Sequence, residues 1–225
     1  IAKPDTCVIT NIGTCHLENL GDRDGVLKAK TEIFQYVKRN IVLNGDDDKL
    51  STVKEYNGMQ PVFFGNGENA SVTCENVESR GLKGKMAENG EFQIFHVDIP
   101  MPGRHMVSNA LAAAAVGRLY GLNAEQIKNG IESLEPVSGR FNMIETDKFM
   151  IVDDCYNANP MSMKASLDVL QDGLGRKVAI LGDMGELGTD EAALHEGVGV
   201  HAGQCRIDAC ICVGPLAAHI AEKAS

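Results

Sequence analysis

The second part of the chain alternates short apolar runs with helix-forming segments, and this alternation restricts the fold more than any other feature. Residues 149–152, 177–181 and 209–213 are apolar enough for buried strands, and a helical pattern follows each of them. Repeated strand–helix units place their strands in parallel and connect them by right-handed crossovers. We therefore predict an α/β fold with a parallel sheet for residues 141–225.

Polar loops follow these strands at the edge of the sheet where a ligand would bind. In open α/β sheets, ligands lie outside the carboxyl ends of the strands. The first exit loop is DDCYNANP at 153–160, and the second is GDMGELG at 182–188. Their acids, amides and tyrosine make this edge a candidate ligand site.

Residues 1–136 form a separate unit in this interpretation, and the stretch 135–139 (EPVSG) is the predicted linker. Asn89-Gly90 is a hairpin signal, Gly121 is a helix stop, and Asn123 with Gln126 resembles a capping box. The expected elements are strands over 6–12, 41–43 and 60–65, an antiparallel hairpin within 70–99, and helices over 105–120 and 123–134.

A lysine lies beside the apolar face of the helix that is expected to begin near Asp22 or Asp24. Lys30 is three or four residues from apolar positions that recur at helical spacing: Val26, Leu27, Ile33 and Phe34. Desolvation disfavours a charged ammonium and favours the neutral amine, which reacts with electrophiles such as carbon dioxide. The alternative is a lysine whose stem covers the core edge while its charge stays in water, and periodicity alone favours that alternative.

Other polar residues in the first unit allow both a functional and a structural interpretation. The loop before the lysine helix supplies His16 and Glu18, a pair that could bind a metal. Asn44, at the end of a buried strand, could contact a nucleotide base or ribose, or could begin a solvated turn. His105 and Asn109 share one helical face and could hydrogen-bond a heteroaromatic ring, or could be surface residues at a helix start.

The residue after the linker, Arg140, could reach a phosphate across a cleft between domains, because arginine suits forked contacts. A lone arginine is weak support for such a site. His195, in the helix after the second exit loop, allows a structural role.

Composition and charge narrow the class of protein. The net charge of −10 argues against nonspecific nucleic-acid binding, and an acidic chain that binds nucleotides would need a divalent cation. No apolar run is long enough to span a bilayer, and no signal peptide is visible. Seven cysteines without a C-x-x-C pair indicate reduced thiols, and a zinc site is not expected. We expect a cytoplasmic monomer that is a piece of a longer enzyme, because both ends look cut.

Seven motifs in this order resemble the Mur ligase family, and together they cover nearly the whole chain. The motifs are TNIGxxHLE at 10–18, AKxEI at 29–33, NGDD at 44–47, GRHMVxNALAAA at 103–114, SGRF at 138–141, DDxYNANPxS at 153–162 and GDMxELG at 182–188. Any one of them is weak, but all seven in family order are specific. The last two resemble those of the ligases that add D-alanyl-D-alanine.

The resemblance implies a fold and a reaction. Residues 1–136 would be part of a mononucleotide-binding central ATPase domain, and residues 137–225 part of a Rossmann-like, parallel-sheet C-terminal ligase domain. With ATP and Mg²⁺, such an enzyme converts UDP-N-acetylmuramoyl-tripeptide to an acyl phosphate, which the amine of D-alanyl-D-alanine attacks in peptidoglycan precursor synthesis. The family's G-K-T/S phosphate loop is absent from these 225 residues. We therefore expect no turnover by this chain alone.

The resemblance also implies roles for individual residues. His16 would bind the metal, and Lys30, if carbamylated, would add oxygen ligands and overturn the interpretation as a surface lysine. The adenine side would be Asn44, His105 and Asn109, and the phosphate and ribose contacts Arg140 and Asp154. The D-alanyl-D-alanine pocket would lie near Tyr156, Asn157, Asn159, Asp183 and Glu186. The alternatives are another amide ligase, of the folylpolyglutamate or diamino-acid-adding type, and a noncatalytic nucleotide-binding module.

Overall fold

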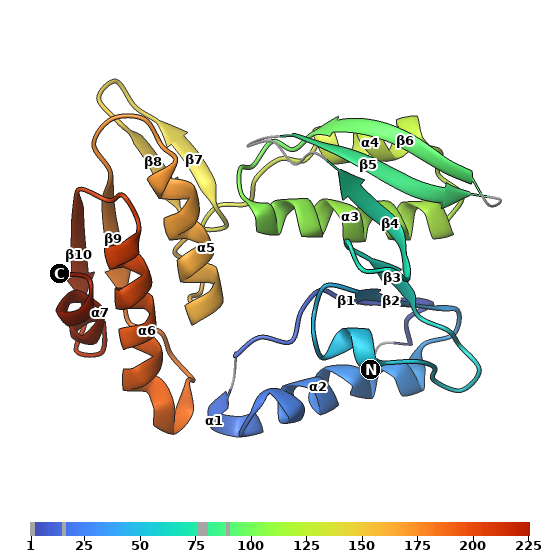
Figure 1. The fold of residues 1–225 in the computed structure, drawn as a ribbon, viewed down its shortest axis with the longest axis horizontal. Helices are drawn as coiled ribbons and strands as arrows, with labels where there is room; N and C mark the ends of the chain where they lie inside the picture. Colours follow the sequence, from blue (N-terminus) through green and yellow to red (C-terminus); the bar gives the residue numbers. More distant parts are fainter. Residues whose placement is uncertain (1–2, 15–16, 76–80, 89–90) are drawn as a thin grey trace. The chain divides into compact units, whose positions relative to one another are not determined.

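The structure, a computed structural model, describes residues 3–14, 17–75, 81–88 and 91–225 (Figure 1). The chain divides into two compact units. The first comprises Ile1–Ile12 with Leu27–Glu135, and the second comprises Gly13–Val26 with Pro136–Ser225. One boundary between the units therefore falls at 135–136, while residues 13–26 cluster with the second unit. The assignment of 1–136 and 137–225 as functional domains stays a prediction.

The first unit contains a mixed sheet of six strands in sequence order. These are β1 (Thr6–Ile9), β2 (Asn40–Asn44), β3 (Val62–Phe64), β4 (Ala70–Glu75), β5 (Gly81–Glu88) and β6 (Glu91–Asp98). β1 to β4 pair in parallel, and β5 and β6 continue the sheet antiparallel. The predicted antiparallel extension is confirmed, although its turn residues Asn89 and Gly90 lie outside the described residues. The first strand ends at Ile9 rather than at residue 12, because side chains bind the main chain of the next three residues.

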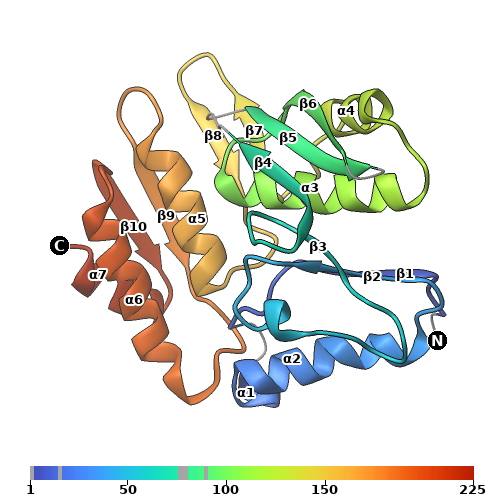
Figure 2. The same ribbon diagram turned by 45° about the vertical axis from the view of Figure 1, so that its right-hand side comes forward.

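The helix α3 (Arg104–Leu119) packs against β2, β3 and β4 (Figure 2). Its apolar side, with Val107 and Leu111, shares a buried core with Val42 and Phe64. The helix ends as predicted, with Gly121 at φ 82° just after the last turn. Asn123 and Gln126 form the predicted capping box at the start of α4 (Ala124–Glu132).

The lysine-bearing segment is two helices rather than one. α2 (Arg23–Thr31) continues into a 3-10 helix at Glu32–Tyr36. A 3-10 helix has three residues per turn, and Phe34 and Val37, three residues apart, are buried. Ile33, which an α-helix would place on the apolar face, is 37 % exposed. The prediction of one continuous helix through these positions is therefore wrong.

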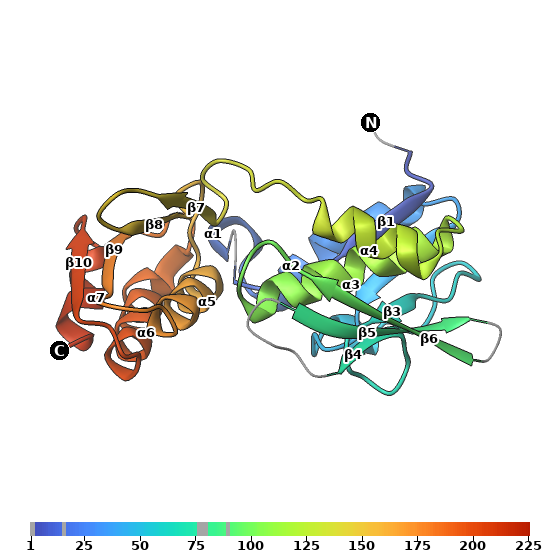
Figure 3. The ribbon, with the colours of Figure 1, turned by 90° about the horizontal axis from the view of Figure 1, so that it is seen from above.

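The second unit contains two small sheets and a layer of helices. β7 (Asn142–Glu145) and β8 (Met150–Asp153) form an antiparallel hairpin, and β9 (Val178–Gly182) pairs in parallel with β10 (Ala209–Val213). The helices are α1 (Leu17–Leu20), α5 (Pro160–Gln171), α6 (Glu191–Gln204) and α7 (Ala217–Lys223). α6 packs against both α5 and α7 (Figure 3).

Two details of this unit differ from the sequence prediction. The parallel pairing was expected to include the strand at 149–152, but in the described residues β8 pairs with β7, a strand that the sequence pattern missed. A tight turn, in which Thr146 N donates to Phe149 O over 3.0 Å, brings these two strands together. The sequence pattern also predicts that the helix after β8 begins at Ser162, but it begins at Pro160, because Asn159 caps it.

Candidate active site

The carboxyl ends of β1 and β2 lie side by side, because the two strands pair in parallel with Ile9 opposite Leu43. Lys30 on α2 points its ammonium at this edge, where Nζ donates to the main-chain oxygen of Asn11 over 2.8 Å. The lysine is half-buried, whereas Lys28, two residues earlier, is exposed. The structure thus places the predicted reactive lysine at the strand end, in contact with the exit loop.

Asn44 holds the same loop from the end of β2. Its Nδ2 donates to Thr10 O over 2.9 Å, and its Oδ1 accepts from Asp46 N over 2.9 Å. Both ends of this amide therefore bind main chain, so Asn44 fixes the β1 exit loop as well as lying at the predicted nucleotide edge. The structural interpretation of this turn and the functional one are compatible.

Asp47 is the most heavily used acceptor of this edge, and sequence reasoning assigned it no role. Its Oδ2 accepts from Ile12 N over 2.7 Å, and its Oδ1 accepts from Lys49 N and Leu50 N, each over 3.0 Å. One carboxylate thus binds the β1 exit loop to the start of a 3-10 helix (Leu50–Thr52). An acid directly after a buried strand was the available signal, but its partner lies 35 residues away.

The other predicted residues of the first unit lie in the first two turns of α3. His105 is half-buried, and Asn109 is exposed one turn later, where Nδ2 contacts Met106 Sδ at 3.8 Å. Their roles as adenine contacts stay predictions. His16, the predicted metal ligand, lies outside the described residues.

In the second unit, the S-G-R-F motif is bound to the first exit loop. Gly139 N donates to Asp153 Oδ2 over 3.1 Å, and Tyr156 N donates to Gly139 O over 3.0 Å. Arg140 then lies over the Tyr156 ring, with its guanidinium carbon 3.8 Å from the ring centroid. Both side chains are exposed. The structure therefore brings two predicted site residues together on one surface and holds the arginine in a stacked position.

Asp154 is fixed by two donors, one for each carboxylate oxygen. Phe141 N donates to Oδ1 over 3.1 Å, and Ser166 Oγ donates to Oδ2 over 2.7 Å. The predicted ribose contact is therefore half-buried and already bonded, and it links the S-G-R-F segment to α5. It positions Arg140 through the residue next to that arginine.

The neighbouring acid and thiol shift each other's protonation in opposite directions. A hydrogen bond from Cys155 is the main cause that lowers the pKa of Asp153. The same hydrogen bond and the negative charge of Asp153 raise the pKa of Cys155. Because its raised pKa keeps the thiol protonated at neutral pH, the exposed Cys155 is a hydrogen-bond donor rather than a thiolate nucleophile.

The two asparagines of the first exit loop differ in their structural roles. Asn159 is the N-cap of α5: its Oδ1 accepts from Met161 N and Ser162 N, each over 3.0 Å. Asn157 is exposed, and its Oδ1 accepts from Ala158 N over 3.0 Å. Asn157 is thus better placed to contact a ligand, while Asn159 sets the position of the helix.

The second exit loop is anchored by hydrogen bonds of its main chain and side chains, while its acids Asp183 and Glu186 are exposed. Met184 N donates to Nε2 of the fully buried His195 over 2.9 Å, and His195 Nδ1 lies 2.7 Å from Glu191 O. These two bonds confirm the structural role for His195, with the proton on Nδ1. Asp183 Oδ1 accepts from Ala217 N over 2.6 Å.

Positive backbone φ angles mark two of the predicted motifs. Phe141 in S-G-R-F has φ 52°, and Glu186 in G-D-M-x-E-L-G has φ 60°. Such angles are uncommon for residues other than glycine and often mark functional sites. Glu186 also accepts a main-chain bond from Glu18 N over 3.3 Å. The loop therefore holds its exposed acid in a strained, fixed conformation.

The fold and these two groups of loops define a member of a known ligase family. A model of the Mur ligase middle domain matches residues 1–117, and a model of the Mur ligase, glutamate ligase domain matches residues 139–225. The chain belongs to the Mur ligase family. The predicted resemblance and the α/β fold class are thus confirmed.

Its similar proteins carry a more specific name. The chain is 35 % identical to the UDP-N-acetylmuramoyl-tripeptide–D-alanyl-D-alanine ligase of Bacillus subtilis, covering 100 % of the chain and 49 % of that ligase. The Escherichia coli ligase of the same name is 34 % identical, with 95 % of the chain and 48 % of the ligase covered. The chain thus spans about half the length of the curated relatives it matches.

Solved structures agree with these relatives. A crystal structure of MurF from Acinetobacter baumannii superposes with a TM-score of 0.88 at 32 % identity, covering 99 % of this chain and 49 % of that one. MurF from Thermotoga maritima, solved in complex with ADP, gives a TM-score of 0.78 at 26 % identity, covering 97 % of this chain and 50 % of that one.

Proposed function

We propose that these residues belong to an ATP-dependent ligase that adds D-alanyl-D-alanine to UDP-N-acetylmuramoyl-tripeptide. The observation that carries the proposal is the position of Lys30, with Nζ at the carboxyl end of β1 and bonded to the Asn11 carbonyl. This is the edge of an α/β sheet where ligands bind. The names of the similar proteins support the same reaction.

The carboxylate of the tripeptide takes a phosphoryl group from ATP in this reaction. The amine of D-alanyl-D-alanine then attacks the acyl phosphate, and the tetrahedral intermediate expels phosphate to leave an amide. Arg140, stacked on Tyr156 and exposed, is suited to bind phosphate oxygens in a forked contact. Asp154 keeps that segment in place through Phe141 N, and it remains a candidate ribose contact.

Lys30 would act as a carbamate. The ammonium loses one proton, and the neutral amine then adds to carbon dioxide and loses a second proton, so that a half-buried cation becomes an anion with two oxygens. Mg²⁺ prefers oxygen ligands, and the Asp47 oxygens nearby already accept main-chain N–H groups. A carbamate on Lys30, with His16, would therefore supply the ligands at this edge. Magnesium, when bound, offsets the negative charge of the phosphates.

The remaining predicted residues divide between nucleotide and acceptor. Asn109 and His105 would contact adenine from the start of α3, and Asn44 would do so from the end of β2. Tyr156, Asn157 and Glu186 are exposed on the loops of the second unit and would contact D-alanyl-D-alanine. Asn159 and Asp183, whose carbonyl and carboxylate oxygens accept main-chain bonds, would shape that pocket.

The proposal also covers location and assembly. We infer that the protein is a cytoplasmic monomer, because UDP-N-acetylmuramoyl-tripeptide and D-alanyl-D-alanine are both soluble small molecules. We also infer that it uses no nucleic acid. No helix among the described residues is long and apolar enough to cross a membrane.

One sequence feature favours a second candidate, a noncatalytic nucleotide-binding module. No G-K-T/S phosphate loop occurs in the 225 residues. If this second candidate function is correct, a protein that contains this chain binds ATP but forms no amide.

Calorimetry with Mg²⁺ and ATP tests the nucleotide site. We expect weak binding that Asn109→Ala abolishes, while Asn129→Ala, an exposed helix asparagine on α4 in the same unit, leaves it unchanged. Equal binding by both variants would contradict the adenine role of Asn109. No binding by any of them would mean that recognition requires the phosphate loop.

Amide formation tests the reaction. An active protein that contains these residues should accept D-alanyl-D-alanine in preference to glutamate or a diamino acid, and Lys30→Ala should remove that activity. A carbamate carbon signal in NMR under ¹³C-labelled bicarbonate, absent in Lys30→Ala, would support the modification. Preference for glutamate or a diamino acid would overturn the substrate assignment.

A further inference from the structure

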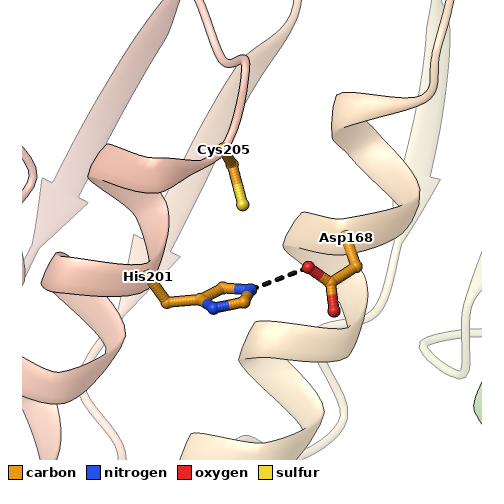
Figure 4. Close-up of side chains that lie close together, drawn as sticks. All are labelled: Asp168, His201 and Cys205. Atoms are coloured by element: carbon orange, nitrogen blue, oxygen red, sulfur yellow. Dashed lines mark hydrogen bonds and ion pairs between the residues drawn. The ribbon is translucent and has the colours of Figure 1, made fainter.

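Three side chains outside the seven motifs converge between two helices of the second unit (Figure 4). Asp168 lies on α5, His201 lies in the last turn of α6, and Cys205 directly follows that helix. His201 Nε2 lies 2.8 Å from Asp168 Oδ1. One ligand atom from each of the three residues lies within 4.8 Å of the other two.

Short-range and long-range geometry both contribute to this cluster. His201 and Cys205 are four residues apart and therefore share one face at the end of the helix. Asp168 comes from 33 residues earlier and faces them because α5 packs against α6. Asp168 Oδ1 also lies 3.4 Å from Gln171 Nε2. The cluster is thus built on two packed helices rather than on a loop.

The donor atoms approach one side of the imidazole ring. In Figure 4 the sulfur of Cys205 lies toward the ring edge that carries the bond to Asp168, and the other ring nitrogen points away. A Cys–His–Asp catalytic relay needs the thiol and the carboxylate on different ring nitrogens. Convergence on one nitrogen suits a common ligand instead.

The distance between His201 and Asp168 fits a metal site after a small movement, and the Cys205 sulfur lies within 4.8 Å of both ligand atoms. Tetrahedral zinc has bonds of about 2.0–2.1 Å to histidine nitrogen, 2.0–2.2 Å to carboxylate oxygen and 2.3 Å to sulfur. The nitrogen and oxygen of such a site are roughly 3.4 Å apart. The pair at 2.8 Å would therefore need to open by roughly 0.6 Å, which rotation of the half-exposed Asp168 side chain can supply.

Although cysteine spacing predicts no zinc site, we propose that Asp168, His201 and Cys205, brought together by two helices, bind a divalent cation of borderline softness, with Zn²⁺ as the expected ion and water in the fourth position. Oxygen, nitrogen and sulfur donors together favour such an ion over Mg²⁺ or Ca²⁺. An ion can reach this site, since the His201 side chain is 26 % exposed and the Asp168 side chain 53 %. The ion would join α5 to α6 and stabilise the second unit.

Protonation of the thiol gives the binding a measurable signature. Burial, and then the charge of Asp168, raise the pKa of Cys205, so its thiol carries a proton at neutral pH. A metal ligand must lose that proton. Binding should therefore release protons, which calorimetry in buffers of different ionisation enthalpy detects.

Metal titration of the chelator-treated chain tests the proposal. We expect one Zn²⁺ per chain by calorimetry, and with Co²⁺ an absorption band from a thiolate ligand. Cys205→Ser should remove the thiolate band. Loss of a side chain that only supports a metal ligand weakens binding by about 10- to 100-fold, so loss of a ligand in Cys205→Ser or His201→Gln should weaken Zn²⁺ binding at least as much. Asp168→Asn, on an exposed side chain, should weaken it without affecting the fold.

Two variants provide matched controls. Cys155→Ser changes the exposed thiol of the first exit loop, and His219→Gln changes a histidine of α7. Both should bind Zn²⁺ as the unmodified chain does. Zn²⁺ should also raise the unfolding temperature of the unmodified chain but not that of Cys205→Ser. No binding, or equal binding by the Cys205, His201 and control variants, would overturn the site.

Discussion

The two units fix their strand-exit loops in different ways. In the first unit, one carboxylate, Asp47, accepts three main-chain N–H groups and ties the β1 exit loop to the next segment. In the second unit, Asp153, Asp154, Asn159 and His195 each hold a different part of two loops. In the first unit one side chain makes all of these hydrogen bonds, whereas in the second unit four side chains share them.

This difference has an energetic consequence. A buried donor that loses its acceptor costs about 1–3 kcal/mol, because it is desolvated without compensation. Loss of one shared acceptor therefore affects several donors at once, whereas loss of one acceptor in a distributed set affects one or two. Single substitutions should be more harmful at Asp47 than at any one residue of the second set.

The largest effect should follow Asp47→Ala. Three main-chain N–H groups lose their bond to this carboxylate, and one of them belongs to Ile12, which is only 1 % exposed. We expect the free energy of unfolding to fall by about 3 kcal/mol, measured by urea denaturation. Glu68→Ala, on an exposed acid of the same unit, should change it by less than about 0.5 kcal/mol. A loss below about 1 kcal/mol for Asp47→Ala would contradict the inference that this one carboxylate stabilises the β1 exit loop.

The next effect should follow His195→Leu. The substitution keeps an apolar side chain in the buried site but removes the acceptor of Met184 N. We expect a loss of about 2 kcal/mol and faster amide hydrogen exchange at Met184 than in the unmodified chain. A loss equal to that of Asp47→Ala would show that the second unit also depends on one anchor.

A smaller effect should follow Asn159→Ala, which removes the N-cap of α5. Loss of such a cap costs about 1 kcal/mol, and Asn159→Asp should restore most of it. Asn157→Ala, two residues earlier, should leave the thermal midpoint nearly unchanged while it weakens acceptor binding. If Asn157→Ala is the more destabilising of the two in thermal unfolding, the assignment of their roles is wrong.

The smallest effect concerns pH. The folded chain lowers the pKa of Asp153 below its unfolded value of about 3.9, so the ionised form is favoured on folding. The resulting stability is present above that unfolded pKa and is lost as the pH falls through the folded one. Cys155→Ala removes the main cause and should raise the folded pKa of Asp153 in a carboxyl ¹³C NMR titration. Identical titrations of the two proteins would exclude the thiol as the cause.

Local sequence patterns predicted many of the elements of both units. Apolar runs located β2, β9 and β10, and local turn or cap chemistry located the end of α3 and the start of α4. The capping box of Asn123 needs only residues three apart, so its signal is contained in the sequence. The 3-10 helix after α2 was missed, because the spacing of Val26, Ile33 and Phe34 fits an α-helix equally well.

The candidate site was predictable as residues but not as contacts. The family motifs contain Lys30, Arg140 and Tyr156. The bond from Lys30 to the Asn11 carbonyl and the stacking of Arg140 on Tyr156 depend on how the chain returns to the sheet edge. Asp47 belongs to the motif at 44–47, but its contact was not predictable for the same reason, since an acid in a turn shows nothing of a donor 35 residues away.

The sequence by itself determined the α/β class, most strand and helix positions, and the family motifs, because these depend on patterns within a few residues. Only the tertiary structure decided that β8 pairs with β7, that Asp47 binds the β1 exit loop, and that Asp168 meets His201 and Cys205. The contacts of Asp47 with Ile12 and of Asp168 with His201 join residues that are 35 and 33 positions apart along the chain. Packing of helices and pairing of strands bring them together, and local periodicity carries no information about that step.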